Sequence, residues 1–266
     1  MKVIAEIGWN FVGDIDLCEK MICAAKESGA DIAKFQYWDP STIKDGPWMH
    51  DGRIEIYKKA ALDDKKISFI LDACKKNKIK PLFSVFNSAG AEYIHSKVQS
   101  VIKIPSHEIA NYDLIDFCSS NFDFIFLSAG ACLESELKKS LSIINKNDCE
   151  FNLMHCISSY PCEIENMNLG RINKLLELHN QVGLSDHSQS LITGALAVSM
   201  GATVIEKHFT IDKDLPGRDN KFALDLGEMS EYIINIKHAS EASKYHGFDL
   251  LECEKDTFLN YRGRWG

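Results

Sequence analysis

Two short segments near the end of the chain combine histidine with other polar residues at a spacing that suits chemistry. Residues 204–219 read VIEKHFTIDKDLPGRD, and residues 182–187 read VGLSDH. Glu206 and His208 are two positions apart, so on a β-strand both side chains point to the same face. Ser185 and His187 repeat this spacing upstream. Unpaired charge inside a buried strand is costly, so a metal or an anionic ligand is the expected reason for these residues.

A single histidine at a strand end is more often a hydrogen-bonded structural residue than a ligand. Here His187 and His208 end two consecutive strands that are separated by a helical segment, and each stands near a carboxylate. This arrangement predicts a pair of metal ligands. The long polar loop after His208, which contains Pro216 and Gly217, has the character of a functional loop rather than a simple connector.

The elements that position these residues alternate between strand and helix along the whole chain. Strands are predicted at residues 2–7, 30–36, 80–85, 101–104, 122–128, 150–155, 181–184 and 202–209. Helices are predicted at residues 15–28, 54–60, 64–77, 89–97, 114–120, 133–145, 169–179, 190–200 and 228–245. Eight regular βα units predict an α/β protein with a (β/α)8 TIM barrel, a single domain over residues 1–266. A doubly wound open sheet is the competing architecture.

Polar side chains interrupt every predicted strand at or just beyond its C-terminal end. These residues are Glu6, Lys34, Gln36, Ser84, Lys103, Ser106, Glu108, Ser128, His155, Ser158, Tyr160, Ser185, His187, Glu206 and His208. In a barrel, the C-terminal ends of the strands converge on one mouth, and active sites lie there. The set therefore predicts a shared site, although each serine alone is more often structural.

The composition of that set indicates the chemistry. Lys34 and Lys103, together with several hydroxyl groups, suit a compact polyanion that carries phosphate and carboxylate. The chain has no P-loop and no GxGxxG motif, so a nucleotide is not indicated. His187 and His208, with Glu6 nearby, could hold a divalent metal that polarises a carbonyl, while the carboxylate takes a proton. The combination suggests carbon–carbon bond formation between a small phosphorylated anion and a carbonyl compound.

Composition narrows the class of protein. The net charge of −8 over 266 residues argues against a nucleic-acid or anionic-membrane partner. The N-terminus enters a strand at once, so no signal peptide is expected, and no apolar run reaches the length of a membrane span. Nine cysteines without CxxC pairs predict reduced thiols in a cytoplasmic enzyme. Cys156 and Cys162 lie near the predicted site and are interpreted as structural.

Six motifs, in order along nearly the whole chain, resemble the sialic acid (N-acetylneuraminate) synthase family, the phosphoenolpyruvate-dependent nonulosonate synthases. They are AEIGWN-x2-GD at 5–14, GADIAKFQ at 29–36, IKIPSHEIAN at 102–111, LMHCISSYP at 153–161, GLSDH at 183–187 and GATVIEKHFTIDKDLPGRD at 201–219. The resemblance implies a TIM barrel that condenses phosphoenolpyruvate with N-acetylmannosamine or a related amino sugar. It also implies a divalent cofactor, Mn²⁺ or Mg²⁺, and a homo-oligomer, with a dimer as the expected form.

The same resemblance implies roles for individual residues. His187 and His208 correspond to the metal ligands, and Glu6 to the residue that handles a proton beside the metal or orients the attacking water. The phosphoenolpyruvate contacts implied are Lys34, Ser84, Lys103, Ser106, Ser128, Ser158 and Ser185. The sugar contacts implied are Gln36, Tyr160 and Asp219.

The chain departs from the family pattern at several positions. Phe11 replaces a usual histidine, Ser158 a common asparagine, and Asn220 the histidine of a PGxDH motif. The family usually appends a C-terminal antifreeze-like domain that gives an arginine to the sugar site of a neighbouring subunit. We expect no such domain here, and Arg218, Arg262 or Arg264 are the candidates to replace that arginine.

Two other functions stay open at this level. One is a related phosphoenolpyruvate-dependent aldolase that uses a different aldose or a phosphorylated acceptor. The other is a catalytically idle barrel that binds sugar or pairs with an active subunit. The presence together of Glu6, Lys34, Lys103, His187 and His208 argues against the idle barrel.

Overall fold

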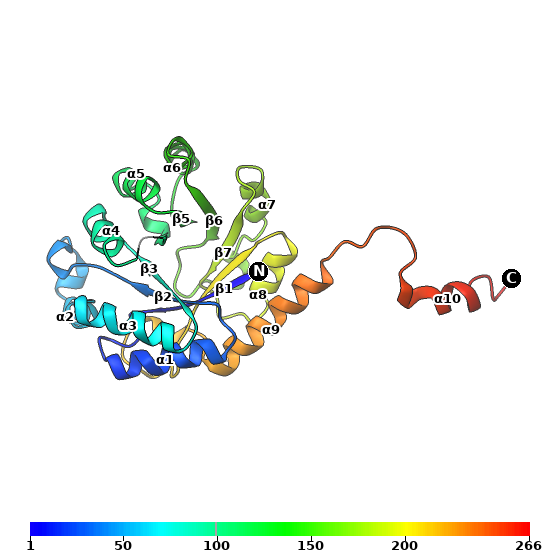
Figure 1. The fold of residues 1–266 in the computed structure, drawn as a ribbon, viewed down its shortest axis with the longest axis horizontal. Coiled ribbons are helices and arrows are strands. Elements are labelled where there is room, and N and C mark those ends of the chain that lie inside the picture. Colours follow the sequence, from blue (N-terminus) through cyan, green and yellow to red (C-terminus); the bar gives the residue numbers. More distant parts are fainter. Residues whose placement is uncertain (99) are drawn as a thin grey trace.

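The computed structural model describes residues 1–98 and 100–266, and in it eight parallel strands close into a barrel in sequence order (Figure 1). The first strand pairs with the second on one side and with the eighth on the other, so the sheet has no free edge. This closure confirms the predicted (β/α)8 barrel and excludes the doubly wound open sheet. The strands are β1 (Lys2–Gly8), β2 (Ile32–Gln36), β3 (Lys80–Ser84), β4 (Val101–Ile104), β5 (Phe124–Ala129), β6 (Glu150–Cys156), β7 (Val182–Asp186) and β8 (Val204–His208).

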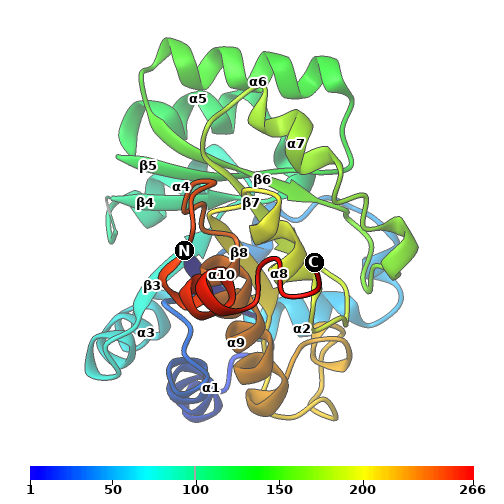
Figure 2. The same cartoon turned by 90° about the vertical axis from the view of Figure 1, so that its right-hand side faces the viewer.

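Helices surround the barrel, and the last helix lies apart from it in the C-terminal segment, as Figures 1 and 2 show from two directions. They are α1 (Ile15–Glu27), α2 (Arg53–Ala60), α3 (Asp64–Lys76), α4 (Ser88–His95), α5 (Tyr112–Asn121), α6 (Glu134–Lys146), α7 (Arg171–Leu176), α8 (Thr193–Ser199), α9 (Leu226–Ala242) and α10 (Lys255–Asn260). Helix α1 illustrates why the sequence folds this way. Asp14 caps it by accepting a hydrogen bond from the Leu17 N–H, and its buried residues recur at helical spacing.

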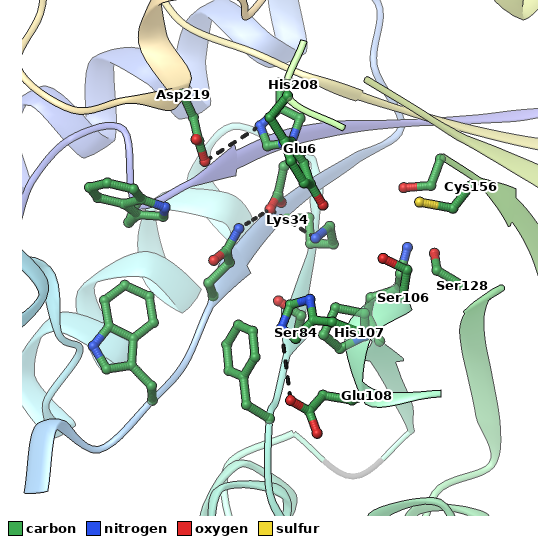
Figure 3. Close-up of a pocket in the computed structure, with 18 of the residues that line it drawn as sticks. Glu6, Lys34, Ser84, Ser106, His107, Glu108, Ser128, Cys156, His208 and Asp219 are labelled. Carbon is green, nitrogen blue, oxygen red and sulfur yellow. Dashed lines mark hydrogen bonds and ion pairs between the residues drawn. The ribbon is translucent and has the colours of Figure 1, made fainter. Parts of the chain in front are cut away.

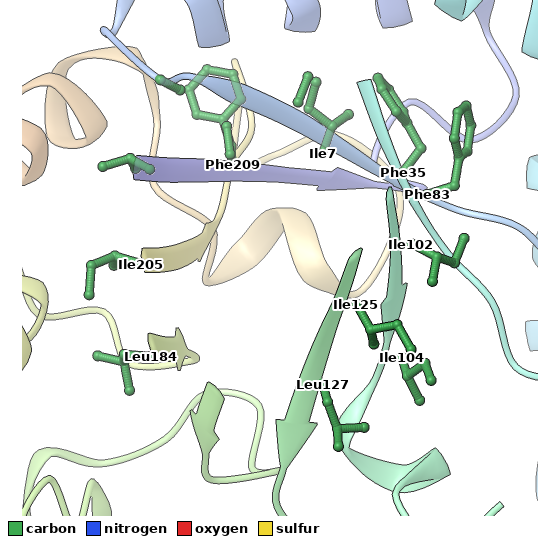
Figure 4. Close-up of a cluster of buried hydrophobic side chains, with 14 of the residues drawn as sticks. Ile7, Phe35, Phe83, Ile102, Ile104, Ile125, Leu127, Leu184, Ile205 and Phe209 are labelled. Carbon is green, nitrogen blue, oxygen red and sulfur yellow. The ribbon is translucent and has the colours of Figure 1, made fainter. Parts of the chain in front are cut away.

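Strand alternation divides the apolar side chains into two cores. Outward-facing residues such as Phe35, Phe83 and Leu127 pack in the large core between the strands and the helices (Figure 4). Inside the barrel, a smaller apolar layer fills the end nearest the strand starts; it comprises Ile4, Ile32, Leu82, Phe126, Met154 and Val204. Further along each strand, the inward positions become polar. The interior of the barrel is therefore filled by apolar side chains near the N-terminal ends of the strands, and it forms a polar cup near their C-terminal ends.

Several predicted element limits differ from the structure. Strand β7 continues to Asp186, beyond the predicted end at 184, because Ser185 and Asp186 remain paired in the ladder with Glu206 and Lys207 of β8. Helices α7 and α8 are shorter than predicted. The sequence also gave no signal for α10, which lies in an exposed C-terminal segment, residues 241–266, that extends away from the barrel in Figure 1.

All nine cysteines are free thiols, as the sequence predicted. Within residues 1–98 and 100–266, no helix has both the length and the apolar character needed to cross a bilayer.

Candidate active site

A cavity of about 670 Å³ opens at the C-terminal ends of the strands (Figure 3). Its volume is that of a typical small-molecule site. All the residues predicted to share a site line it except His155 and Ser158: Glu6, Lys34, Gln36, Ser84, Lys103, Ser106, Glu108, Ser128, Tyr160, Ser185, His187, Glu206, His208 and Asp219. The structure therefore brings residues from all parts of the chain to one place, as the strand-end pattern predicted.

Two buried lysines and two buried glutamates form the floor of the cavity. The Lys103 ammonium lies 2.7 Å from Glu206 Oε2, and the Lys34 ammonium lies 2.9 Å from Glu6 Oε1 and 3.6 Å from Glu206 Oε1. Ser185 donates a hydrogen bond of 2.9 Å to Glu206. Glu206 belonged to the predicted strand-end set but was given no role, and the structure makes it the carboxylate partner of both lysines.

The charges of this floor depend on one another. Burial opposes ionisation of Glu206, but Lys103 and then Lys34 outweigh it, so the pKa of this carboxyl is far below its usual range. Burial also lowers the pKa of Lys103, against the opposing effect of Glu206. For Glu6, burial raises the pKa and Lys34 only partly offsets the rise. Before substrate binds, the two carboxylates compensate the cations that an anionic ligand would use.

The serine hydroxyl groups above the floor differ in whether they have hydrogen-bond partners within the protein. Ser128 Oγ is buried and has no hydrogen-bond partner among the described residues, so it is free to bind a ligand. Ser106 Oγ shares a hydrogen bond of 2.7 Å with Ser158 Oγ. Ser158 does not line the cavity, because the turn after β6 places its hydroxyl behind Ser106 and beside Gly130. The hydroxyl of Ser158 therefore meets the cavity only through its hydrogen bond with Ser106.

The two histidines face each other on one wall. Their ring centroids are 5.4 Å apart. The Nδ1 of His187 lies 2.8 Å from the Ile157 carbonyl, so this nitrogen donates, and in the neutral imidazole Nε2 has a free lone pair. The Nδ1 of His208 lies 3.9 Å from Asp219 Oδ2 and has no hydrogen-bond partner among the described residues. Burial, followed by the charge of His187, lowers the pKa of His208 well below its ordinary value and keeps that imidazole neutral.

This wall fits a divalent ion. A metal–nitrogen distance of about 2.1 Å puts two imidazoles that share an ion at a centroid separation on the order of 5 Å, close to the separation here. Glu6 Oε2, which lines the same cavity, is buried without a hydrogen-bond partner in the described residues. Residues 1–98 and 100–266 contain no cluster of three or more potential ligands of the His, Cys, Asp and Glu types. Two histidines would therefore leave coordination positions open for substrate or water.

Aromatic side chains form the outer rim, and sequence reasoning missed them. Trp9, Trp38, Trp48, Tyr57 and Phe86 all line the cavity. The indole N–H groups of Trp38 and Trp48 donate to backbone carbonyls, so these residues satisfy their polar atoms internally. The concentration of tryptophan in the polar insertion after β2 was the available signal.

The structure corrects two interpretations of residues near β6. Cys156, interpreted as structural, lines the cavity, with Sγ 3.8 Å from His187 Nδ1. Its position two residues after the inward-facing Met154 would have predicted this. His155 faces the opposite way and bonds the Met167 carbonyl at 2.8 Å, so it is not part of the mouth. Cys162 is buried in the apolar core, as expected.

The departures from the family pattern now have structural explanations. Phe11 is buried and packs edge-on against Phe35. Asn220 is buried and ties the loop after β8 to the loop after β1, by donating to the Asn10 and Pro216 carbonyls.

Of the three candidate arginines, one reaches the site. Arg218 lines the cavity. Arg262 and Arg264 lie in the exposed C-terminal segment, where they stack on Phe258, Tyr261 and Trp265.

The closed barrel, with lysines, hydroxyls and paired histidines in one cup, defines a (β/α)8 synthase for an anionic substrate. The chain belongs to the NeuB family, whose model matches residues 21–247. It is similar to the N,N'-diacetyllegionaminic acid synthase of Legionella pneumophila, with 32% identity over 89% of this chain and 71% of that protein. It is also 32% identical to the pseudaminic acid synthase of Helicobacter pylori, over 90% of this chain and 74% of that protein.

Structural comparison agrees with this assignment. The sialic acid synthetase of Leptospira borgpetersenii, solved in complex with citrate, superposes with a TM-score of 0.88 at 27% identity, covering 96% of this chain and 89% of that chain. The family match confirms the resemblance that was inferred from the sequence motifs.

Proposed function

We propose that the protein condenses phosphoenolpyruvate with an open-chain amino sugar, N-acetylmannosamine or a close relative, and releases inorganic phosphate. One observation carries this proposal. Two buried lysines and a pair of facing histidines share a single cavity with Ser128, whose hydroxyl has no hydrogen-bond partner among the described residues. Cations and free hydroxyls suit the phosphate and carboxylate of one substrate, and the histidine wall suits the carbonyl of the other.

Phosphoenolpyruvate is assigned to the floor. Lys34 and Lys103 supply fixed positive charge there, and Ser84, Ser106, Ser128 and Ser185 supply hydroxyl donors. When the phosphoenolpyruvate trianion binds, its negative charge replaces part of the charge compensation that Glu6 and Glu206 provide to the two lysines. Because both lysines are almost fully buried, their interaction with the ligand is weakly screened by water.

The sugar is assigned to the space between the floor and the rim. Gln36, Tyr160 and Asp219 provide polar contacts, and the aromatic rim covers the less polar surface of an N-acyl sugar. Arg218 also lines this space and supplies a cation for the acceptor. Tyr160 stacks close to His187, with ring centroids 4.2 Å apart, so a sugar hydroxyl bound there lies beside the histidine wall.

A divalent ion, Mn²⁺ or Mg²⁺, held by His187 and His208 would supply a Lewis acid for the sugar aldehyde. The new bond joins C3 of phosphoenolpyruvate to the aldehyde carbon, and the aldehyde oxygen takes up a proton. Water then adds at C2, and the C2–O bond to phosphate breaks to leave a ketone. Glu6 is placed to accept the proton of that water, since its Oε2 has no hydrogen-bond partner among the described residues and burial raises its pKa.

A second acceptor class has specific support. Lys44 and Arg218 both line the outer cavity, and two cations at the mouth suit a phosphorylated sugar.

We also propose that the enzyme works as a homodimer in the cytoplasm, with no nucleic-acid or membrane partner.

Phosphate release from phosphoenolpyruvate, measured with a panel of aldoses with and without Mn²⁺, tests the proposal. Release that requires an N-acyl hexosamine and the metal supports it. Release only with phosphorylated or unrelated aldoses assigns the enzyme to the second acceptor class. No release with any acceptor contradicts both and favours an idle sugar-binding barrel.

A further inference from the structure

A second buried polar cluster lies outside the cavity, on the opposite face of β7 and β8, and the proposed mechanism does not use it. Asp186 and Lys207 form its centre, with the ammonium 2.8 Å from Asp186 Oδ2. Both side chains are almost fully buried, at 1% exposure each. A buried ion pair adds little net stability compared with an apolar pair, so its presence here calls for another explanation.

Every group in this cluster is satisfied, and the partners come from four elements. Tyr232 of α9 donates a hydrogen bond of 2.6 Å to Asp186 Oδ2, and Thr193 of α8 donates to the same oxygen. Ser188 donates to Asp186 Oδ1 from both its N–H, at 2.9 Å, and its hydroxyl, at 2.8 Å. The Lys207 ammonium also donates to Ser188 Oγ at 3.2 Å and stacks over the Tyr232 ring at 4.8 Å.

The approach of α9 to this cluster depends on a glycine in α8. A Cβ at Gly194 would lie 2.6 Å from the Tyr232 hydroxyl. Because Gly194 has no side chain, α8 and α9 can pack closely at the point where Tyr232 contacts Asp186 of β7.

The position of the cluster connects it to the site. Asp186 stands between Ser185 and His187 in the chain, and Lys207 stands between Glu206 and His208. Ser185 pairs with Glu206 and Asp186 with Lys207 in the strand register. Hydrogen bonds therefore join the same two strands on both faces: Ser185 to Glu206 inside the cavity, and Lys207 to Asp186 outside it. Ser188, which directly follows His187, is fixed by the outer set.

We propose that Asp186, Lys207 and Tyr232 form a positioning cluster that holds His187 and His208 at the separation a shared metal ion requires. This inference rests on the proposed function of the two histidines. The cluster acts through the backbone of β7 and β8 and touches neither substrate nor metal. It extends the support of the metal ligands to helix α9, which contributes no residue to the cavity.

The test compares Tyr232→Phe with wild type by titrating metal-free protein with Mn²⁺ and following free Mn²⁺ by electron paramagnetic resonance. Mutation of a residue that hydrogen-bonds a metal-coordinating side chain directly changes metal affinity by about 10- to 100-fold. Tyr232 bonds Asp186, which bonds neither histidine, so we expect a smaller effect, a rise of roughly 5-fold in the Kd for Mn²⁺, just below that range. The KM for phosphoenolpyruvate should stay unchanged, because Lys34 and Lys103 lie on β2 and β4.

Tyr93→Phe is the matched control, since Tyr93 OH donates to Asp64 at 2.9 Å at the surface. Ser188→Ala provides a second variant with a smaller change in packing, and the same rise in Kd is expected. A purely structural cluster would lower the melting temperature and leave the Kd of the folded protein at the wild-type value, which would overturn the inference alone. Wild-type protein that takes up no Mn²⁺ would overturn the proposed metal site, and this inference with it.

Discussion

Replacing Glu206 with glutamine tests the charge balance of the cavity floor most sharply. Glu206 is the carboxylate partner of Lys103, at 2.7 Å, and it also lies 3.6 Å from Lys34. Lys34 keeps Glu6 as a partner in the variant, whereas no other carboxylate within the described residues forms a salt bridge with Lys103. Glu206→Gln therefore leaves one buried ammonium without a compensating charge.

The size of the effect follows from that geometry. Breaking a buried ion pair by removing one partner costs about 3–5 kcal/mol. The glutamine oxygen can still accept a hydrogen bond from Lys103, so we expect a loss near the lower end, about 3 kcal/mol. For a chain of this size, each kcal/mol shifts the melting temperature by roughly 2–4 °C, and the expected fall is about 6–12 °C.

Phosphoenolpyruvate should reverse much of this loss, because its phosphate and carboxylate supply the missing negative charge. Melting curves in a buffer without phosphate, recorded with and without phosphoenolpyruvate, measure both quantities. The ligand-induced rise in melting temperature should be larger in Glu206→Gln than in wild type. Glu55→Gln is the matched control, since Glu55 pairs with Lys58 at the surface and such pairs contribute about 0–1 kcal/mol.

The pH dependence gives an independent check of the same reasoning. Because the folded-state pKa of Glu206 is depressed, its stabilisation is present above the unfolded pKa of about 4.3 and is lost as the pH falls below it. The difference in stability between wild type and Glu206→Gln should therefore begin to shrink below about pH 4 and keep shrinking as the pH falls toward the depressed folded-state pKa. A melting temperature for Glu206→Gln equal to that of Glu55→Gln, or a smaller response to phosphoenolpyruvate than in wild type, would refute the account.

Three further substitutions separate the roles of the cavity walls. Burial, and then repulsion from Glu6, raise the pKa of Asp219 to about 6, so wild-type stability falls as the pH rises from about 4 to about 6. Asp219→Asn should remove that loss and so raise the free energy of unfolding by about 3 kcal/mol at pH 7.5, as measured by denaturant titration, while weakening the binding of the acceptor sugar. If the free energy of unfolding changed equally with pH in both proteins, this assignment would be wrong. His208→Ala should stay folded but lose Mn²⁺ binding and the release of phosphate. Normal turnover by this variant after treatment with a chelator would disprove that expectation. Lys103→Ala should raise the KM for phosphoenolpyruvate more than the KM for the sugar, and the reverse order would mean that the two subsites are interchanged.

The strand alternation made most of the site predictable from the sequence. Lys34 and Gln36, or Ser185 and His187, share an inward face because side chains alternate along a strand, and barrel closure brings those faces together. The same rule contained the information for Glu206 and Cys156, which lie two positions from His208 and Met154. The sequence analysis placed Glu206 on this face without a role and did not apply the rule to Cys156.

The parts that could not be predicted depend on loop conformation and helix packing. The aromatic rim is set by how the insertion after β2 folds over the mouth, and residue periodicity does not determine that. Ser158 was misplaced because the turn after β6, rather than strand alternation, sets its direction. The contact of Tyr232 with Asp186 joins elements 46 positions apart through the packing of α8 and α9, so no local pattern signals it.

The central claim is that the mouth of the barrel holds a metal ion and phosphoenolpyruvate side by side. Anomalous diffraction from crystals grown with Mn²⁺ and phosphoenolpyruvate tests it directly. The account predicts one manganese peak within bonding distance of nitrogens from both His187 and His208, with the ligand's phosphate or carboxylate against Lys34 and Lys103. A manganese peak away from the two imidazoles, or a ligand that leaves both lysines uncontacted, would contradict it.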